Sequence, residues 1–491
     1  MAYRLLVWFL RALLAVFFRQ IEVVGLEHVP GSGPVIFVGN HPNSLLDPAL
    51  IVTQQPRRVS FLAKSTLFES RLLRPLLLAL GAVPIKRRKD HVDDGSGTID
   101  NTESFGALFE LLREGGACGI FPEGISHSGS ELAPLRTGAA RIALGAAQEQ
   151  AADGAASSGG TPREAKGPVR IVPCGLNYFR RTRMRSRLLV QFGPPLEVTP
   201  RRLEEHARDE RAAVRELTDD IDASLRALTL NAPDFETLRT LDTVRRLYTP
   251  PLQELTLAQQ TELTRRFSNQ YEQLLEKPEV QGLYQETARY LAELDALGLQ
   301  DEQLSRPITA GGWVARLLGH YLLLFVLVPL AVPGLLIHAP ALAAAILAGD
   351  VLTRRKTVAA TTKMLVLGGL VPLAYALVIG GLALGVEPPW NLRLALVAAA
   401  VLPLSGWALI RVLERQAGLR RGLWAAFTLF VLRRKVARMR VQRADLARRI
   451  QEAVERYVDP SLRRIIPPPE RVDEIPPEPP PGSARSPRDD P

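Results

Sequence analysis

Cysteine is nearly absent from this sequence, and no disulfide or metal-binding pattern is present. Its 491 residues include two cysteines, Cys118 and Cys174, which have no pair spacing. A disulfide framework and a CxxC metal site are therefore excluded, and no metal or bound cofactor is expected. The catalytic part of the chain is expected to lie in a reducing compartment.

Nucleic-acid signatures are missing as well. The sequence has no zinc-finger spacing and no run of interleaved aromatic and basic residues, although its formal net charge is +10. Such an excess of basic residues then indicates anionic lipid or a phosphorylated substrate as the partner. The apolar segments later in the chain favour both of these over nucleic acid.

The two clear candidate membrane spans lack charges in their interiors. Residues 364–384 and 392–410 are each long enough to span a bilayer, and neither carries Asp, Glu, Lys or Arg at depth. Such charges mark a transport path, so their absence argues against a transporter. The stretch 313–348 is too long for one span and contains three prolines, which predicts a re-entrant hairpin or two tilted helices.

Basic residues around these segments predict their orientation. Four of them follow the first apolar stretch: Arg354, Arg355, Lys356 and Lys363. A cluster of arginines follows residue 410. Basic flanks favour the cytoplasmic side, so residues 313–348 should enter and return on one face, and the catalytic domain should face the cytoplasm. The Arg-, Ala- and Leu-rich composition is typical of a GC-rich bacterium and predicts a bacterial inner membrane.

Residues 1–20 predict a membrane-associated helix. Arg11 interrupts the apolar run and no small-residue cleavage site follows it, which argues against a signal peptide. A helix that lies on or dips into the bilayer fits this pattern better. A helix buried in the protein core is the alternative.

Residues 21–200 predict an α/β catalytic domain with a largely covered sheet. Strands are expected at 34–40, 59–63, 117–121, 169–173 and 188–192, and a short strand or turn is expected at 83–87. Helices are expected at 67–80, 104–113 and 138–150. The stretch 151–167 is rich in Ala, Gly and Ser, which is typical of a surface loop.

The rest of the chain divides by composition. Residues 201–310 predict a helical extension without a catalytic motif, and 311–411 form the membrane region. Residues 412–465 are a basic helical segment, in which 433–457 is expected to lie near anionic headgroups. The Pro-rich tail, 466–491, is expected to be disordered.

His41 and Asp47 form the first candidate catalytic pattern. A histidine ends an expected strand, and an aspartate follows it closely. A carboxylate on one ring nitrogen fixes the histidine tautomer and leaves the other nitrogen to take a proton. No serine or cysteine nucleophile motif accompanies the pair, so the base would act directly on a substrate hydroxyl. A lone His-x5-Asp is more often structural, so the neighbouring motifs decide between these readings.

Further polar motifs lie at expected strand ends. The basic run 86–89 includes Arg87, whose planar fork suits a phosphate, although such a run is usually a solvated turn. Glu123 and Gly124 follow the next strand; the glycine permits close backbone approach, and the carboxylate suits a hydroxyl or an arginine. The segment 173–178 ends another strand. An open α/β sheet binds its ligands at such ends.

Taken in order, these motifs resemble the four blocks of the PlsC-like glycerolipid acyltransferase family. The blocks here are Asn40-His41 through Asp47, Gly81 through Arg87, Phe121-Pro-Glu-Gly124, and the strand that ends at Pro173. The resemblance covers residues 20–200 and implies a mixed sheet flanked by helices, as in glycerol-3-phosphate acyltransferases. The family mostly has four residues between the histidine and the aspartate, whereas this chain has five. Asn43 or Ser44 is then a candidate cap for the helix that starts there.

A fungal-type subgroup, the glycerol-3-phosphate/dihydroxyacetone-phosphate acyltransferases, is similar in more detail. The matching segments are Phe121-Pro-Glu-Gly-Ile-Ser-His, Leu135-Arg-Thr-Gly-Ala, Gly175-Leu-Asn-Tyr-Phe, Arg185-Ser-Arg and Phe192-Gly-Pro-Pro. Enzymes of this subgroup are also similar to this chain in their longer His–Asp gap, helical extension and C-terminal membrane spans.

The resemblance implies a role for each candidate site residue. His41 would be the general base and Asp47 the carboxylate that orients it. Arg87, together with the turn of Glu123 and Gly124, would hold the glycerol phosphate. The implied reaction transfers an acyl group from acyl-CoA or acyl-carrier protein to the sn-1 hydroxyl of glycerol 3-phosphate or dihydroxyacetone phosphate. Backbone N–H groups near Gly124 are candidate donors to the oxyanion.

Three other residues keep two interpretations each. By resemblance, Lys64 and Arg136 would contact phosphate or the acyl donor, but a solvated lysine at a strand end explains Lys64 equally well. His127 is either a second site residue or a polar loop residue. Two other functions also stay open for the chain: acylation of lysophosphatidic acid, and a non-catalytic membrane scaffold or transporter.

Overall fold

The computed structural model describes residues 2–71, 73–85, 102–156, 167–250, 253–305, 310–353 and 355–458. Arg87, the tail 466–491 and most of the loop expected at 151–167 lie outside these residues. The chain divides into two compact units. The first comprises residues 1–239 and 307–433, and the second comprises 240–306 and 434–491.

The first unit begins with helix α1 (Ala2–Phe17), which leads directly into strand β1 (Phe18–Val24). One side of α1 is buried in the core through Leu14 and Phe17, whereas Leu5 and Trp8 on another side are exposed. The helix therefore combines the two interpretations given to residues 1–20: it packs into the core and also presents an apolar surface. No strand was expected at β1.

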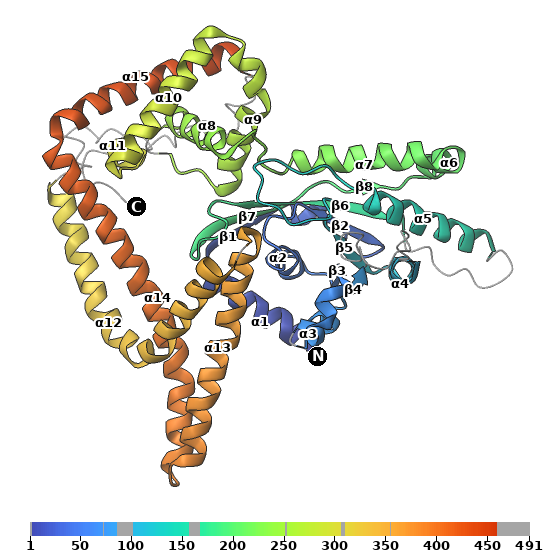
Figure 1. The fold of residues 1–491 in the computed structure, drawn as a ribbon, viewed down its shortest axis with the longest axis horizontal. Helices are drawn as coiled ribbons and strands as arrows, with labels where there is room; N and C mark the ends of the chain where they lie inside the picture. Colours follow the sequence, from blue (N-terminus) through green and yellow to red (C-terminus); the bar gives the residue numbers. More distant parts are fainter. Residues whose placement is uncertain are drawn as a thin grey trace, which may run out of the picture. The chain divides into compact units, whose positions relative to one another are not determined.

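An eight-stranded mixed sheet forms the centre of the first unit (Figure 1). The remaining strands are β2 (Val35–Gly39), β3 (Val59–Lys64), β4 (Val83–Ile85), β5 (Ala117–Ile120), β6 (Arg170–Tyr178), β7 (Ser186–Phe192) and β8 (Leu196–Glu197). Their order is β1-β7-β6-β2-β5-β3-β4, with β8 also paired to β6. Strands β2 to β6 are mutually parallel, and β7 and β8 are antiparallel to β6. The expected α/β class is confirmed.

Helices cover both faces of the sheet. Alternate residues of each central strand point to opposite faces, and their apolar side chains are buried by helices on each side. In β2, Val35 and Phe37 pack with α1 and α2 (Leu46–Gln54). Ile36 and Val38 pack on the other face with α4 (Thr102–Arg113), α5 (Gly138–Ala156) and α7 (Glu210–Arg226). The continuous apolar run of this strand is typical of a strand buried on both faces.

Two expected helices have different bounds in the structure. The helix expected at 67–80 is a short 3-10 segment, η2 (Ser65–Glu69), followed by α3 (Leu73–Ala79). The helical extension expected at 201–310 is divided between the units. Helices α6 (Pro200–Arg208) and α7 belong to the first unit because the apolar face of α7 covers the sheet; Leu217 and Ile221 are each 1% exposed there.

Three long apolar helices complete the first unit. They are α12 (Ala310–Ile346), α13 (Lys356–Gly385) and α14 (Trp390–Val431), with a π-helical segment, η4 (Leu347–Leu352), after α12. Among the described residues, three helical segments are long and apolar enough to cross a membrane: Leu318–Leu352, Lys356–Gly385 and Trp390–Val431. In Figure 1, α13 and α14 run side by side as a hairpin.

The stretch for which a re-entrant hairpin or two tilted helices were expected is one helix, α12, with three prolines in its interior. Figure 1 shows that this helix is not straight: it bends sharply and reverses its direction before η4. Its first part packs on α14, where Leu327 and Ala331 meet Ala408 and Leu409 in one buried cluster. Its later part runs along α13, where the His338 ring lies 2.7 Å from the Tyr375 hydroxyl. Two tilted segments are therefore present within α12, and a re-entrant path through the membrane stays a prediction.

The second unit is a helical bundle. It contains most of α8 (Phe235–Tyr248), together with α9 (Leu257–Leu275), α10 (Pro278–Leu297), α11 (Asp301–Ser305) and α15 (Arg433–Tyr457). The helix expected at 433–457 is confirmed. However, α15 is amphipathic and buries Met439, Leu446 and Ile450 within the unit, so only its other face is available to headgroups.

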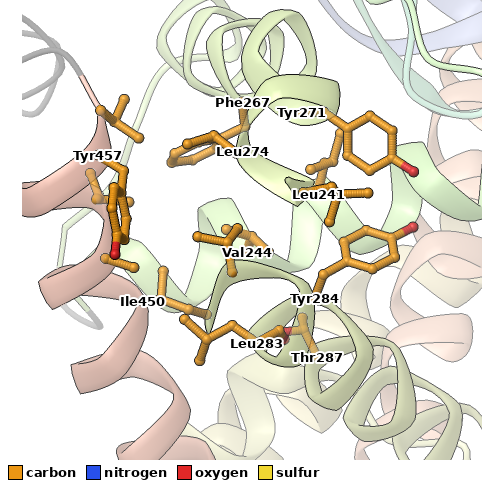
Figure 2. A pocket seen from close by; sticks show the side chains of 15 residues that line it. Leu241, Val244, Phe267, Tyr271, Leu274, Leu283, Tyr284, Thr287, Ile450 and Tyr457 are labelled. Carbon is orange, nitrogen blue, oxygen red and sulfur yellow. The ribbon is translucent and has the colours of Figure 1, made fainter. Parts of the chain in front are cut away.

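The bundle encloses an apolar cavity of about 70 Å³ (Figure 2). Its walls come from α8, α9, α10 and α15. Figure 2 shows Tyr271 and Tyr284 next to each other in this wall, with their ring centroids 5.6 Å apart. Beside the cavity-lining residues, a buried ion pair joins α15 to α11: the guanidinium of Arg443 donates to both carboxylate oxygens of Asp301 at 2.8 and 2.9 Å.

Candidate active site

The His41–Asp47 pair forms at the carboxyl end of β2. Strand β2 ends at Gly39, and Asp47 lies in the first turn of α2. His41 Nδ1 and Asp47 Oδ2 are 2.9 Å apart, and the Asp47 side chain is fully buried. The His41 side chain is 13% exposed. With Nδ1–H donated to the carboxylate, the other ring nitrogen, Nε2, carries a lone pair that can accept a proton.

Asp47 is held by two further donors. The Tyr178 hydroxyl donates to Asp47 Oδ1 at 2.6 Å, and the backbone N–H of Asn43 donates to Oδ2 at 2.7 Å. Burial, and then the negative charge of Asp47, raise the pKa of Tyr178 well above its usual value. The phenol therefore stays protonated and remains a donor. These contacts confirm that His41 and Asp47 meet despite the five-residue gap.

The backbone at Ser44 explains how the longer gap closes. Ser44 has φ 51°, in the left-handed region, so the chain turns back sharply before α2. Its N–H donates to the hydroxyl of Ser126 at 3.1 Å. Neither Asn43 nor Ser44 is the residue before α2; that position is Leu45, and it has no side-chain capping bond. The expected cap was therefore wrong, and Asn43 and Ser44 shape the catalytic loop.

Phe121 and Glu123 support His41 from the segment after β5. The His41 and Phe121 rings are stacked with centroids 4.1 Å apart and an interplanar angle of 8°. Glu123 Oε1 accepts the backbone N–H of His41 at 2.7 Å, while Oε2 accepts the N–H of Ala133 at 3.1 Å and contacts the ring of His127. The Glu123 side chain is fully buried. Both of its oxygens are thus occupied by protein groups.

Gly124 is required for a tight turn against Arg136. Its φ is +70°, and its N–H donates to the carbonyl of Phe121 at 3.0 Å. This N–H, a candidate oxyanion donor from the sequence, is therefore already bonded within the turn. A Cβ at this position would lie 2.6 Å from Arg136 Nε. The close approach places the Arg136 guanidinium across the turn.

Alanine at position 124 is therefore expected to destabilise the protein. Left-handed backbone strain costs about 1–3 kcal/mol, and the new Cβ also displaces Arg136. Chemical denaturation of the purified Gly124→Ala variant would measure this loss. Gly106→Ala is the matched control, since Gly106 lies in α4 with nothing within 4 Å of the added Cβ. Equal stability of the two variants would contradict the prediction.

The other predicted site residues are distributed around the pair. Lys64 is the last residue of β3, where it pairs with Ile85 of β4. The backbone N–H of His127 donates to the carbonyl of His41 at 3.3 Å, which brings His127 beside the pair. Arg87 lies outside the described residues. Sequence reasoning assigned no role to Tyr178, although the segment 173–178 had been singled out as a strand end.

Two family models match this chain. Residues 20–177 match the Acyltransferase model, and residues 240–463 match the model of the glycerol-3-phosphate acyltransferase 2 C-terminal domain. The chain is therefore similar to PlsC-like acyltransferases over residues 20–177 and to glycerol-3-phosphate acyltransferase 2 over residues 240–463. The acyltransferase domain contains β1 to β6 and every member of the His41–Asp47 cluster, apart from Tyr178 at the end of β6. The C-terminal domain starts at the residue where the second structural unit begins.

Curated fungal proteins are similar to this chain. An uncharacterized acyltransferase of Schizosaccharomyces pombe is 26% identical over 75% of this chain and 66% of its own length. Glycerol-3-phosphate O-acyltransferases 2 and 1 of Saccharomyces cerevisiae are 28% and 27% identical, over 62% and 76% of this chain. This chain covers 52% and 60% of those two proteins, so it spans between half and two thirds of these relatives.

One solved structure also matches. The 1-acyl-sn-glycerophosphate acyltransferase PlsC from Thermotoga maritima is 17% identical, covering 44% of this chain and 79% of that chain with a TM-score of 0.29. The similarity to acyltransferases rests on the sequence matches, and the three long apolar helices among the described residues indicate association with a membrane.

Proposed function

We propose that this protein transfers an acyl group from a thioester to the sn-1 hydroxyl of glycerol 3-phosphate or dihydroxyacetone phosphate. The observation that carries the proposal is the His41–Asp47 pair, in which a buried carboxylate bonds Nδ1 of a partly exposed histidine. Two similar proteins named glycerol-3-phosphate O-acyltransferase support the choice of acceptor. The donor is acyl-CoA or acyl-carrier protein, and no cofactor is needed.

The reaction proceeds by general base catalysis at His41. Nε2 of His41 takes the proton of the acceptor hydroxyl as the oxygen attacks the thioester carbonyl. Asp47 stabilises the imidazolium that forms. The tetrahedral intermediate collapses by breaking its carbon–sulfur bond, and the leaving thiolate takes the proton from His41. The products are the acylated glycerol phosphate and the free thiol.

The remaining polar residues either position His41 or bind the phosphate of a substrate. Glu123 positions the backbone of His41, because its side chain is fully buried and both oxygens bond protein groups. Arg87, Lys64 and Arg136 supply positive charge for the phosphate of the acceptor or donor. Gly124 brings the Arg136 side chain across its turn. Orientation of a bound acceptor by such groups contributes several kcal/mol, about 7–11 in the most favourable cases.

The membrane helices keep this chemistry at a lipid surface. Basic residues at 354–356 and after residue 410 favour a cytoplasmic catalytic domain at a bacterial inner membrane. Leu5 and Trp8, which α1 exposes, add a second apolar contact from the catalytic domain itself. The lipid product then leaves directly into the bilayer.

Tyr178→Phe is expected to slow this reaction about 10-fold. The Tyr178 hydroxyl is one of three donors to Asp47, and a hydrogen bond to a charged group contributes about 1.5–3 kcal/mol. Without it, the carboxylate holds the His41 tautomer less firmly. Steady-state rates of Tyr178→Phe and of Tyr321→Phe, whose side chain is exposed on α12, would be compared. A rate unchanged in Tyr178→Phe would contradict the role given to this hydroxyl.

The proposed acceptor is tested by offering each candidate separately. Purified protein in phospholipid vesicles would be given acyl-CoA or acyl-carrier protein with glycerol 3-phosphate, dihydroxyacetone phosphate or lysophosphatidic acid. Acylation of either small phosphate at the primary hydroxyl supports the proposal. Acylation of lysophosphatidic acid alone would move the enzyme to the second step of the sequence. No transfer to any acceptor would leave the non-catalytic scaffold.

A further inference from the structure

The start of α13 lies against the catalytic loop. Ala360 and Met364, in its second and third turns, belong to the buried cluster that also contains Leu46 and Leu50 of α2. Ala360 is fully buried. An apolar helix long enough to cross a membrane therefore begins inside the core of the acyltransferase domain.

Thr361 bonds to the loop that holds Asp47. Its hydroxyl donates to the carbonyl of Asn43 at 2.9 Å, and Thr361 is 1% exposed. The N–H of the same Asn43 donates to Asp47 Oδ2 at 2.7 Å. Two consecutive hydrogen bonds thus connect α13 to the carboxylate that bonds His41. The Asn43 side chain is fully buried as well, so water does not replace these bonds.

Lys363 fastens the same turn of α13 to the segment after β6. Its ammonium group donates to the carbonyl of Thr182 at 3.0 Å and contacts Asp350 of η4 at 2.6 Å. Lys363 is 4% exposed, so the charge expected to face the cytoplasmic surface is turned into the protein. Thr182 follows Arg181, whose carbonyl accepts the Asn43 side chain at 3.3 Å. Helix α13 is therefore bonded to Asn43 itself and also to the segment that accepts the Asn43 side chain.

A second membrane helix is attached nearby. The guanidinium of Arg185 donates to Glu414 of α14 at 2.6 Å and to the carbonyls of Ala15, Val16 and Phe18 at 2.8–3.0 Å. The junction between α1 and β1 is thereby linked to α14. These contacts fix the helices against the domain independently of Thr361, so removal of one hydroxyl need not detach them.

We propose that the first two turns of α13 are a positioning element for the catalytic pair, with Thr361 as the positioning residue that acts through Asn43 on Asp47. This inference rests on the proposed role of His41 as the base. The groups that face Asp47 are Tyr178 from β6, Arg181 from the turn after it, His41 and the Asn43 amide. Thr361 is the residue of α13 that acts on these groups, through the carbonyl of Asn43. It therefore links the position of α13 to the orientation of His41.

The test replaces the hydroxyl while keeping the shape of the side chain. Thr361→Val is expected to lower kcat about 5- to 10-fold with little change in KM, because one hydrogen bond that orients the base is lost. Thr361→Ser restores the hydroxyl and should restore kcat. Thr362→Val is the matched control, since the Thr362 hydroxyl donates to Val358 within α13 and does not touch the catalytic loop.

A double-mutant cycle separates positioning from general damage. In an Asp47→Asn background, Thr361→Val should have no further effect on the residual rate, because its route to His41 is already broken. An equal loss in both backgrounds would overturn the proposal. So would a normal kcat in Thr361→Val, or a loss in Thr362→Val of the same size.

A readout without acyl transfer keeps this test separate from the proposed function. Diethyl pyrocarbonate modifies the free nitrogen of His41, and peptide mass spectrometry follows the rate at fixed pH. Thr361→Val should slow this modification about threefold or more relative to wild type, while Thr362→Val leaves it unchanged. This result would support positioning even if no acceptor were acylated. Equal modification rates in all three proteins would overturn it.

Discussion

Replacing His41 by alanine is expected to lower the rate of acyl transfer by about 10²- to 10⁴-fold, the usual contribution of a general base. The side chain supplies the only imidazole that bonds Asp47 among the described residues. The substitution also removes a ring that stacks on Phe121 at 4.1 Å, so folding must be checked by circular dichroism. Binding of acceptor and donor should change little, which places the loss in kcat.

His206→Ala is the control for the His41 substitution. His206 lies in α6, in the last turn of a helix that contributes no residue to the catalytic cluster. Its replacement should leave kcat within about twofold of wild type. A His41→Ala protein that is folded and retains more than a tenth of the wild-type rate would contradict the role of His41 as base.

Replacing Arg443 by methionine is expected to destabilise the second unit by about 3–5 kcal/mol. The loss arises because Asp301 would remain buried without its bidentate partner, and among the described residues its remaining hydrogen-bond donor is the Tyr290 hydroxyl at 2.7 Å. Burial lowers the pKa of Arg443, but the hydrogen bonds to Asp301, its negative charge and the contacts with Tyr290 together outweigh burial, so the pKa is raised and the guanidinium stays charged. Amide hydrogen exchange in α10 should accelerate about 10²-fold or more in the variant.

Arg440→Met provides the comparison for the Arg443 variant. Arg440 lies on the exposed side of the same helix, three residues earlier, so its loss should change exchange in α10 less than twofold. An Arg443→Met protein with unchanged exchange would show that the ion pair contributes nothing net. Such a result is known for buried pairs whose desolvation cost offsets their attraction.

The His–Asp cluster was predictable because the carboxyl ends of neighbouring parallel strands lie at the same end of the sheet. His41 follows β2, Glu123 follows β5 and Tyr178 ends β6, and these three strands are neighbours in the sheet. Order along the chain therefore brought the right segments together. The partners of the Glu123 side chain were not predictable, because a carboxylate in a turn can accept hydrogen bonds from a substrate hydroxyl or from backbone N–H groups.

The contribution of the membrane helices was hidden from the sequence. Thr361 and Lys363 stand 318 and 181 residues from the carbonyls that they bond. No periodicity connects such distant residues, and Lys363 reads as an ordinary basic flank of an apolar segment. The composition of this region predicted apolar helices correctly but not that α13 begins inside the catalytic domain.

Segment boundaries failed where packing overrides local composition. Residues 201–310 are uniformly polar and helical in pattern, yet α7 covers the sheet while α9 and α10 form a separate bundle with α15. The prolines of α12 predicted a change of direction, and Figure 1 shows that the helix bends sharply without ending. By contrast, the alternating charge and apolar pattern of α15 predicted its bounds correctly.

Activation of the hydroxyl of a glycerol phosphate by His41 is tested most directly with radiolabelled glycerol 3-phosphate. Its transfer into lipid would be measured with vesicles that contain either wild-type protein or His41→Ala. We expect 1-acylglycerol 3-phosphate with the wild type and a rate at least 10²-fold lower with the variant. Equal rates for the two proteins, or no labelled lipid with either, would contradict it.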